Sequence, residues 1–251
     1  MARLAVLLRP RRGSRNELSG GGTLCRHLTT QPNPRGFPMY VPQQFKIGEL
    51  SENIAVMRGN PFAALISHDA EGLMGTHLPT LVKQDGDAIV IEAHLARGNP
   101  HWRRLATAPD TEIMMIFSGP DAYIRPGWYP SKAENGKQVP TWNYAIVHAY
   151  GRAETISDGA WLLRHVSELS RQQESPYEMP WQTSDAPAGY IEGLTRGIVG
   201  LRLTVTRLDG KAKMGQNREA RDALGAVAGL EARDRGADRA VAAAMRRMRV
   251  D

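Results

Sequence analysis

The chain has 251 residues, of which 41% are hydrophobic and 23% are charged, and it contains a single cysteine, Cys25. This composition is typical of a globular protein, and one cysteine excludes a disulfide framework or a cysteine-based metal site within one chain. No apolar run approaches the roughly 18 residues that cross a membrane, so we expect a cytoplasmic protein with no membrane partner.

The basic excess lies at the start of the chain. The formal net charge is +6, yet residues 1–38 hold seven arginines and one acid, which leaves 25 basic and 25 acidic residues in 39–251. A formally neutral body does not indicate a basic docking face for nucleic acid. We interpret 1–38 as a disordered or artefactual extension, with an organelle transit peptide or a nucleic-acid-binding arm as the alternatives. We expect 39–251 to form one domain.

The predicted elements alternate between short strands and helices. In chain order they are a helix over 46–58, a hairpin of strands over 62–67 and 73–82, a strand over 88–94 that leads into a short helix, a strand over 111–117 that turns at 118–121 into 122–124, a long strand over 139–156, helices over 161–173 and 188–196, a strand over 198–208, and two helices within 218–250. This order predicts an α+β, mainly β fold, in which a small antiparallel barrel carries flanking and C-terminal helices.

The turn after the strand over 88–94 is a candidate anion site. Asn99 is the predicted N-cap and Pro100 the first residue of the short helix. Free N–H groups at a helix start bind anions, Gly98 allows close approach, and Arg97 offers a bidentate fork. The functional interpretation is a phosphate cradle, and the alternative is an ordinary capped turn.

A proline interrupts the predicted strand over 73–82. Pro79 lacks the N–H that a sheet ladder needs, so we expect a sheet edge, a bulge or a break there. Such irregularities aim neighbouring side chains, which makes His77 a candidate ligand contact. A histidine that is hydrogen bonded inside the barrel is the alternative.

Five side chains share one face of the predicted strand over 139–156 and include three aromatic rings. This face suits a planar ligand, a subunit interface or a plain core. Together with the cradle, it would suit a mononucleotide cofactor. The five are Trp142, Tyr144, Ile146, His148 and Tyr150.

The common catalytic and metal-binding motifs are absent from the sequence. It contains no Gly-x-Ser-x-Gly, no His-Glu-x-x-His, no Walker loop and no dinucleotide-binding glycine fingerprint. We therefore name no catalytic residue and no metal ligand.

Seven blocks of sequence occur in an order that resembles the PaiB family, described as FMN-binding negative transcriptional regulators. The resemblance covers essentially all of 39–250 and implies a split barrel like that of the pyridoxamine-phosphate oxidases, a homodimer, and FMN bound at the subunit interface. The blocks are Met39-Tyr40-Val41-Pro42, Thr76-His77-Leu78-Pro79, Ala96-Arg97-Gly98-Asn99-Pro100-His101-Trp102, residues 117–124, Val139-Pro140-Thr141-Trp142-Asn143-Tyr144, Gly197-Ile198-Val199-Gly200 and residues 211–217.

The resemblance also implies roles for individual residues. Arg97 and Asn99 would hold the FMN phosphate, and Gly98 and Gly215 stand where the family pattern leads us to expect alanine and serine. Of the other expected cofactor contacts, Thr76, His77 and Leu78 would run beside the flavin and ribityl chain, and Trp142 and Asn143 would approach from the interface. The remaining expected contacts are His94, Lys213, Gln216 and Asn217.

Three functions remain open at this point. The resemblance favours an FMN-binding regulator or flavin-dependent sensor. DNA as a partner is suggested by the resemblance alone. The alternatives are a flavin-dependent oxidoreductase and a haem-binding split barrel with His77, His94 or His148 as the axial ligand.

Overall fold

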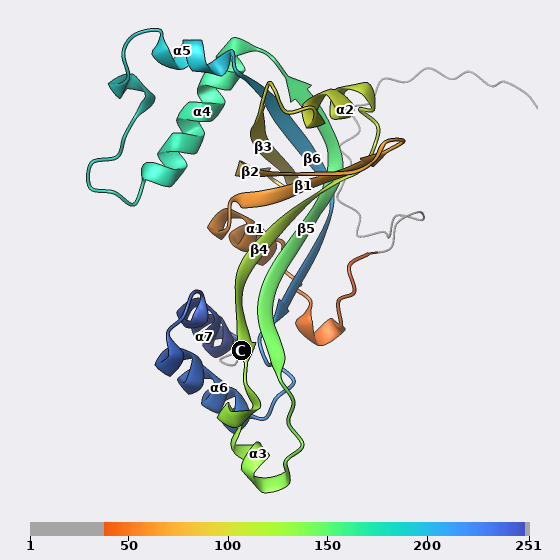
Figure 1. Cartoon of the computed structure of the whole chain (residues 1–251), viewed down its shortest axis with the longest axis vertical. Helices are drawn as coiled ribbons and strands as arrows, with labels where there is room; N and C mark the ends of the chain where they lie inside the picture. Colours follow the sequence, from red (N-terminus) through yellow and green to blue (C-terminus); the bar gives the residue numbers. More distant parts are fainter. Residues whose placement is uncertain (1–37, 249–251) are drawn as a thin grey trace, which may run out of the picture.

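A computed structural model describes residues 38–248 of the chain (Figure 1). The predicted extension over 1–38 therefore lies, apart from its last residue, outside the described residues. No helix within the described part is long and apolar enough to cross a membrane.

Six antiparallel strands close into a barrel, in the order β1-β2-β3-β6-β5-β4. Each neighbouring pair is antiparallel, which confirms the predicted barrel. The strands are β1 (Phe62–Asp69), β2 (Gly72–Asp85), β3 (Ala88–Ala96), β4 (Ile113–Ile124), β5 (Thr141–Ile156) and β6 (Ile198–Lys213).

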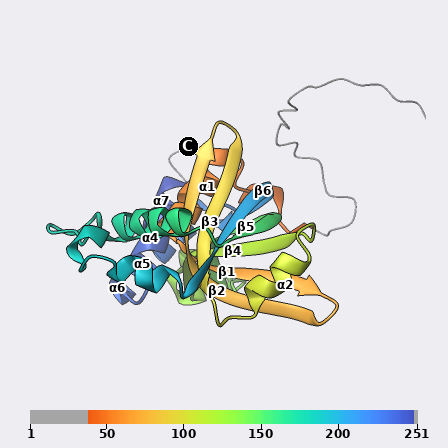
Figure 2. The ribbon, with the colours of Figure 1, turned by 90° about the horizontal axis from the view of Figure 1, so that it is seen from above.

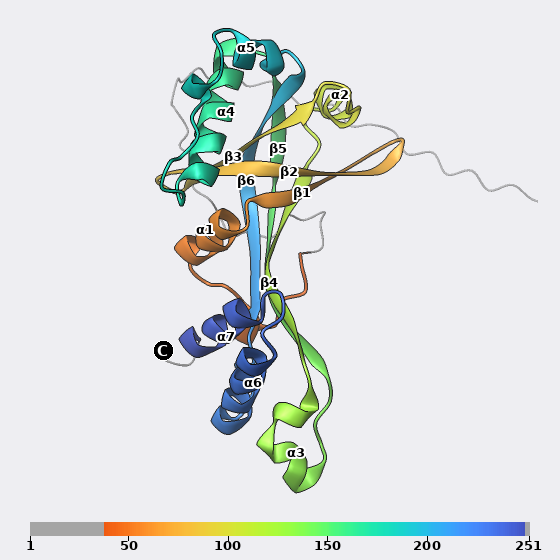
Figure 3. The same cartoon turned by 60° about the vertical axis from the view of Figure 1, so that its left-hand side comes forward.

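Apart from α1, which lies beside the middle of the long strands (Figure 1), the helices gather at the two ends of these strands. In Figure 1, α4 and α5 lie at the upper end and α3, α6 and α7 at the lower end, and Figure 3 shows the same separation. Seen from above, α4 and α2 lie on opposite sides of the barrel (Figure 2). The helices are α1 (Leu50–Gly59), α2 (His101–Thr107), α3 (Pro130–Asn135), α4 (Gly159–Glu174), α5 (Tyr190–Thr195), α6 (Ala220–Arg233) and α7 (Asp238–Arg247), with short 3-10 turns η1 (Gln43–Phe45), η2 (Pro126–Trp128) and η3 (Thr183–Asp185).

Alternation along the strands fills the barrel interior. On β5, Val147 and Ala149 are fully buried, whereas Ile146, His148 and Tyr150, which alternate with them, lie half-buried on the outside of the barrel. The interpretation of the aromatic face as plain core is therefore wrong, because these side chains point away from the barrel interior. An interface or a ligand surface remains.

Two predicted boundaries are wrong for reasons of strand pairing. The first helix begins at Leu50 rather than 46, because Lys46 forms a β-bridge with Lys211 and the Ile47 N–H donates to the Gly210 carbonyl, 3.0 Å away. The turn expected at 118–121 is instead a bulge: β4 continues to Ile124, and its register against β5 shifts between Ser118 and Asp121.

Pro79 does not break β2. It lies opposite Phe62, the first residue of β1, and from Thr80 onward β2 pairs with β3 instead. Pro79 has no backbone N–H to donate, and it lies at the point where β2 changes its pairing partner from β1 to β3. One consequence is that residues 72–79 pair only with β1, so within the described chain their other edge has no neighbouring strand.

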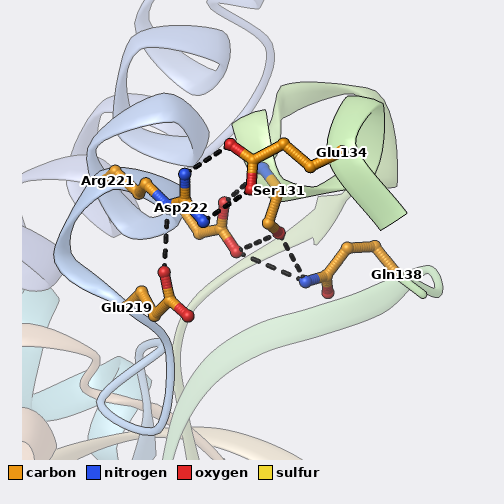
Figure 4. Close-up of polar contacts among 6 residues, drawn as sticks. All are labelled: Ser131, Glu134, Gln138, Glu219, Arg221 and Asp222. Carbon is orange, nitrogen blue, oxygen red and sulfur yellow. Dashed lines mark hydrogen bonds and ion pairs between the residues drawn. The ribbon is translucent and has the colours of Figure 1, made fainter. Parts of the chain in front are cut away.

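The C-terminal helices dock on the excursion between β4 and β5. Asp222 of α6 is buried and accepts hydrogen bonds from the Ser131 N–H (3.1 Å), the Ser131 hydroxyl (2.6 Å) and Gln138 Nε2 (3.3 Å) (Figure 4). Burial raises the pKa of Asp222, but the hydrogen bonds from Ser131 and the charges of Arg221 and Arg218 together outweigh it, so the pKa is lowered. The carboxylate therefore stays ionised and ties α6 to α3.

Candidate functional site

Four polar residues meet where α2 begins, and we call them the His101 cluster: Ser67, Thr76, Asn99 and His101. The imidazole of His101 is fully buried, with Nδ1 2.8 Å from Thr76 Oγ1 and Nε2 2.8 Å from Ser67 Oγ. Asn99 Nδ2 donates to Thr76 Oγ1 at 3.3 Å. Strand pairing and the chain reversal before α2 thus bring β1, β2 and the 97–100 turn together.

The predicted N-cap is wrong by one residue, because Pro100 rather than Asn99 is the N-cap of α2, although the Asn99 side chain still reaches the helix start. Its side-chain Oδ1 accepts the His101 N–H at 2.9 Å, and α2 begins at His101 rather than at Pro100. The helix has only 7 residues, so the side chains of the cluster, rather than a helix dipole, provide the polar chemistry here.

Arg97 joins two strands. Its Nε and Nη2 donate to the carbonyls of Arg196 and Ile198 at 2.9 and 3.0 Å, and its own N–H donates to Gly197 O at 2.7 Å. These bonds tie the end of β3 to the start of β6. Two of the guanidinium donors are therefore engaged by the protein, which leaves less of the fork for a phosphate than the sequence led us to expect.

The three consecutive residues 76–78 point in alternate directions. Leu78 is buried in the core, on the same side of β2 as Thr76. His77 points to the outside of the barrel, where its ring stacks on Phe62 with 6.1 Å between the ring centroids. Thr76 and His77 therefore serve different sides of the strand.

His94 pairs with a second histidine that the sequence did not single out. His94 Nδ1 lies 3.0 Å from His165 Nε2 on α4, and the His165 ring stacks on Trp161 at 5.0 Å. Burial lowers the pKa of His165 to about 4, with smaller contributions from His94 and Lys83, and burial also lowers the pKa of His94. Both rings are therefore neutral near pH 7.

His148, the third haem-ligand candidate beside His77 and His94, also has a protein partner. Its Nδ1 lies 3.3 Å from the Tyr150 hydroxyl, and burial lowers its pKa. The described residues contain no group of three or more His, Cys, Asp or Glu side chains that could hold a metal ion.

A second group of predicted contacts lies near the end of β6. Lys213 Nζ donates to the Trp142 carbonyl at 2.8 Å and to the Thr141 hydroxyl. Burial lowers the pKa of Lys213, and the charges of Arg218 and Lys211 lower it further. The Trp142 ring is 53% exposed and meets Tyr123 edge-on at 5.9 Å.

The remaining predicted contacts mainly shape this end of the chain. Asn143 is buried and its Nδ2 donates to Met245 Sδ of α7 at 3.3 Å. Gln216 closes the turn after β6, accepting from Met214 N at 2.7 Å and donating to Ala212 O at 2.6 Å, while Asn217 is exposed. Gly215 has φ +80°, which explains why glycine suits this position better than the expected serine.

The predicted contacts fall into two groups, one formed by Arg97 and the His101 cluster and the other by Trp142 and Lys213. These two groups lie far apart within one chain. Arg97 contacts the residues at the start of β6, and Lys213 is its last residue. A strand of 16 residues spans on the order of 50 Å at about 3.3 Å per residue. One small ligand therefore cannot touch the His101 cluster and Lys213 of the same copy.

Between the two groups lies a half-buried apolar surface, which we call the outer face. It runs across neighbouring strands of the barrel. Its residues are Ile66 of β1, Met114 and Ile116 of β4, and Ile146, His148 and Tyr150 of β5.

Comparisons with known proteins identify the family of the chain. Residues 39–207 match the model of a family described as "Putative FMN-binding domain". The "Protease synthase and sporulation protein PAI 2" of Bacillus subtilis is 29% identical over 193 residues, which cover 77% of this chain and 89% of that protein. An uncharacterized protein of Emericella nidulans is 31% identical over 227 residues, covering 77% of this chain and 90% of the relative.

Among solved structures, the FAD and haem binding protein from Mycobacterium smegmatis aligns with a TM-score of 0.49 at 15% identity, covering 71% of this chain and 78% of that one. The six-stranded antiparallel ring with flanking and C-terminal helices is the split barrel that the sequence resemblance implied.

Proposed function

We propose, from the premise that the chain belongs to the PaiB-type family of FMN-binding domains, that two copies bind FMN in sites to which both copies contribute. The observation that carries this proposal is the separation of the two contact groups by the length of β6. Neither group alone offers both the polar cluster and the exposed aromatic ring that a mononucleotide would contact. The outer face lies between the two groups.

A two-fold axis would unite the groups. In an isologous dimer each copy presents the same surface to its partner. An axis that crosses the outer face near His148, midway along β5, reverses the strand direction in the partner. The His101 cluster of one copy then meets Trp142 and Lys213 of the other, and the apolar side chains of the outer face are buried between the copies.

The residues fit the chemistry of FMN. Because Asn99 Nδ2 donates to Thr76 Oγ1, Thr76 belongs beside the phosphate rather than beside the flavin and ribityl chain. The Thr76 hydroxyl, the Asn99 amide and the Lys213 ammonium are donors suited to a phosphate, and the exposed Trp142 offers a surface for a flat ring system. Within residues 38–248, one edge of residues 72–79 has no neighbouring strand, and it adds backbone polar groups beside Thr76. When bound, FMN supplies electron transfer through its ring; the residues of the chain bind and orient it.

Mixed dimers test the shared site. Thr76→Val and Lys213→Ala should each weaken FMN binding in a homodimer. If the two variants are co-expressed with different tags, each mixed dimer carries one site with both defects and one intact site. About a quarter of all sites should then bind FMN at a concentration that saturates the wild type. Binding that does not recover in the mixture would contradict a shared site, and a colourless wild type that ignores added FMN would overturn the proposal.

We infer further that the flavin-bound dimer serves as a regulator or sensor. The name of the Bacillus subtilis relative, which links it to protease synthesis and sporulation, supports this role. Four of the five arginines of α6 and α7 form ion pairs, which does not favour a DNA-binding surface there; they are Arg221, Arg233, Arg239 and Arg246. Selection of genomic DNA fragments with and without FMN tests the regulatory role. Enrichment of one sequence supports it, whereas no enrichment together with rapid NAD(P)H oxidation favours a flavin-dependent oxidoreductase.

A further inference from the structure

The His101 ring is held between two hydroxyl groups. Ser67 Oγ lies 2.8 Å from Nε2 and Thr76 Oγ1 lies 2.8 Å from Nδ1, and neither residue neighbours His101 in the sequence. Burial lowers the pKa of His101, the charge of Arg104 lowers it further, and Asp69 opposes them. The ring is therefore neutral near pH 7, with one N–H and one acceptor nitrogen.

Ser67 decides which nitrogen carries the proton. Ser67 is 6% exposed, and within residues 38–248 the hydrogen-bond partner of its hydroxyl is His101 Nε2. If Nε2 carried the proton, the buried Ser67 O–H would lack an acceptor, at an energetic cost. The Ser67 hydroxyl therefore donates to Nε2, and the proton of the ring lies on Nδ1.

The direction of the Thr76 hydroxyl follows from this tautomer. Thr76 Oγ1 accepts from His101 Nδ1 and also from Asn99 Nδ2, 3.3 Å away. A hydroxyl oxygen has two lone pairs, and both are then occupied. The Thr76 O–H is left to donate to a group outside the cluster, and Thr76 is only half-buried.

We infer that His101 is a positioning residue that holds the Thr76 hydroxyl as a donor to the phosphate of FMN, so that the site selects FMN over riboflavin. The inference rests on the proposed function, and it goes beyond that function by assigning the source of phosphate specificity. Because Asn99 is hydrogen bonded to Thr76, an anion that contacts the Asn99 amide lies within reach of the Thr76 hydroxyl. An anionic acceptor makes the stronger hydrogen bond.

Two variants of His101 distinguish the roles of its two ring nitrogens. The amide nitrogen of asparagine reaches the place of Nδ1, and that of glutamine the place of Nε2. His101→Gln should therefore weaken FMN binding about ten-fold or more, as should Thr76→Val, whereas His101→Asn should stay within about three-fold of the wild type. The affinity for riboflavin, which lacks the phosphate, should not change in any of the three.

A double-mutant cycle distinguishes positioning from a general structural defect. If His101 acts through the hydroxyl of Thr76, His101→Gln adds no further loss of FMN affinity in a Thr76→Val background. The inference would be overturned if the two single-variant losses of FMN affinity multiplied in the double variant. It would also be overturned if the affinity for riboflavin fell by the same factor as that for FMN.

The wild-type protein offers a test that needs no variant. Long-range ¹H–¹⁵N spectra of the full chain, labelled at histidine, report which ring nitrogen carries a proton. We expect the Nδ1-protonated tautomer for His101, and the Nε2-protonated form would overturn the inference. FMN binding by the wild type that is unchanged in His101→Gln would refute this inference alone, whereas absence of FMN binding by the wild type would refute it together with the proposed function.

Discussion

Two buried histidines, His101 and His165, show how differently the same side chain is satisfied in this molecule. Both ring nitrogens of His101 have hydroxyl partners. The Nε2 of His165 contacts His94, but its Nδ1 has no hydrogen-bond partner within residues 38–248. A buried imidazole with an incomplete set of partners resists protonation, because a buried charge needs hydrogen bonds that the site does not supply.

This resistance predicts a loss of stability in mild acid. The pKa of His165 is lowered from 6.5 to about 4 in the folded chain, so the unfolded chain binds the extra proton first. The contribution of His165 is complete above pH 6.5, and it falls as the pH drops toward about 4, by about 3 kcal/mol at most. His165→Phe keeps an aromatic ring against Trp161 and removes the titrating group.

Urea denaturation of both proteins between pH 4 and pH 7 measures this effect. The free energy of unfolding should depend less steeply on pH in His165→Phe than in the wild type. Equal slopes would show that His165 becomes protonated in the folded protein as readily as in the unfolded chain.

At the scale of elements, the docking of α6 depends on close contacts that have few substitutes. Asp222 joins α6 to α3, and Gly225 and Gly229 allow the helix to approach Trp128 of η2. A Cβ at Gly225 would lie 2.1 Å from the Trp128 carbonyl oxygen, and a Cβ at Gly229 would lie 2.2 Å from its ring. Removing either kind of contact should weaken the packing of the whole C-terminal helical pair.

Asp222→Ala should destabilise the protein by about 1–3 kcal/mol, because it leaves the Ser131 N–H and hydroxyl buried without their acceptor. The neighbouring Arg221 forms exposed ion pairs with Glu134 and Glu219 (Figure 4). Arg221→Ala is the matched control and should leave the unfolding midpoint nearly unchanged. Thermal unfolding monitored by circular dichroism compares them, and a similar effect of both variants would contradict the role of Asp222.

Gly225→Ala should also destabilise the fold, by about 1–3 kcal/mol, because the clash with backbone outweighs the helical preference of alanine. Gly59, at the end of α1, has nothing within 4 Å of its Cβ position. Gly59→Ala should be neutral or slightly stabilising. Urea denaturation midpoints measure both, and a stabilised Gly225→Ala would mean that α6 packs less closely against η2.

At the scale of the whole molecule, the outer face decides whether the site can be completed. Ile146→Lys places a charge in the middle of this apolar surface, and we expect the mass in light scattering to fall to that of a monomer. Affinity for FMN should fall about ten-fold or more with it, because each copy then holds only half of the contacts. Met179→Lys, at a residue that is 89% exposed between α4 and α5, should leave both the mass and the affinity unchanged.

A monomeric Ile146→Lys that still binds FMN with wild-type affinity would place the whole site within one chain. A wild type that is monomeric would exclude the shared site directly.

The sequence by itself determined most of the elements and the family. Alternation and helical spacing are local properties, so they located all six strands and the helices α4 to α7, although β4 runs to Ile124 rather than 117 and β6 to Lys213 rather than 208. The order of the blocks from Met39 to Asn217 placed the chain in the PaiB-type family. The same local signals marked Thr76 and Asn99 as contacts, because Asn99 precedes a helix and Thr76 lies in a recognisable block.

The tertiary structure alone decided which of these residues meet. His101 contacts Ser67 and Thr76 across 34 and 25 positions in the chain, and His94 meets His165 across 71. Such pairs depend on strand register and on how helices close the barrel, which local periodicity does not encode. For the same reason the structure showed that β4 bulges instead of turning, that Arg97 is engaged by backbone carbonyls, and that the predicted contacts form two groups at opposite ends of one strand.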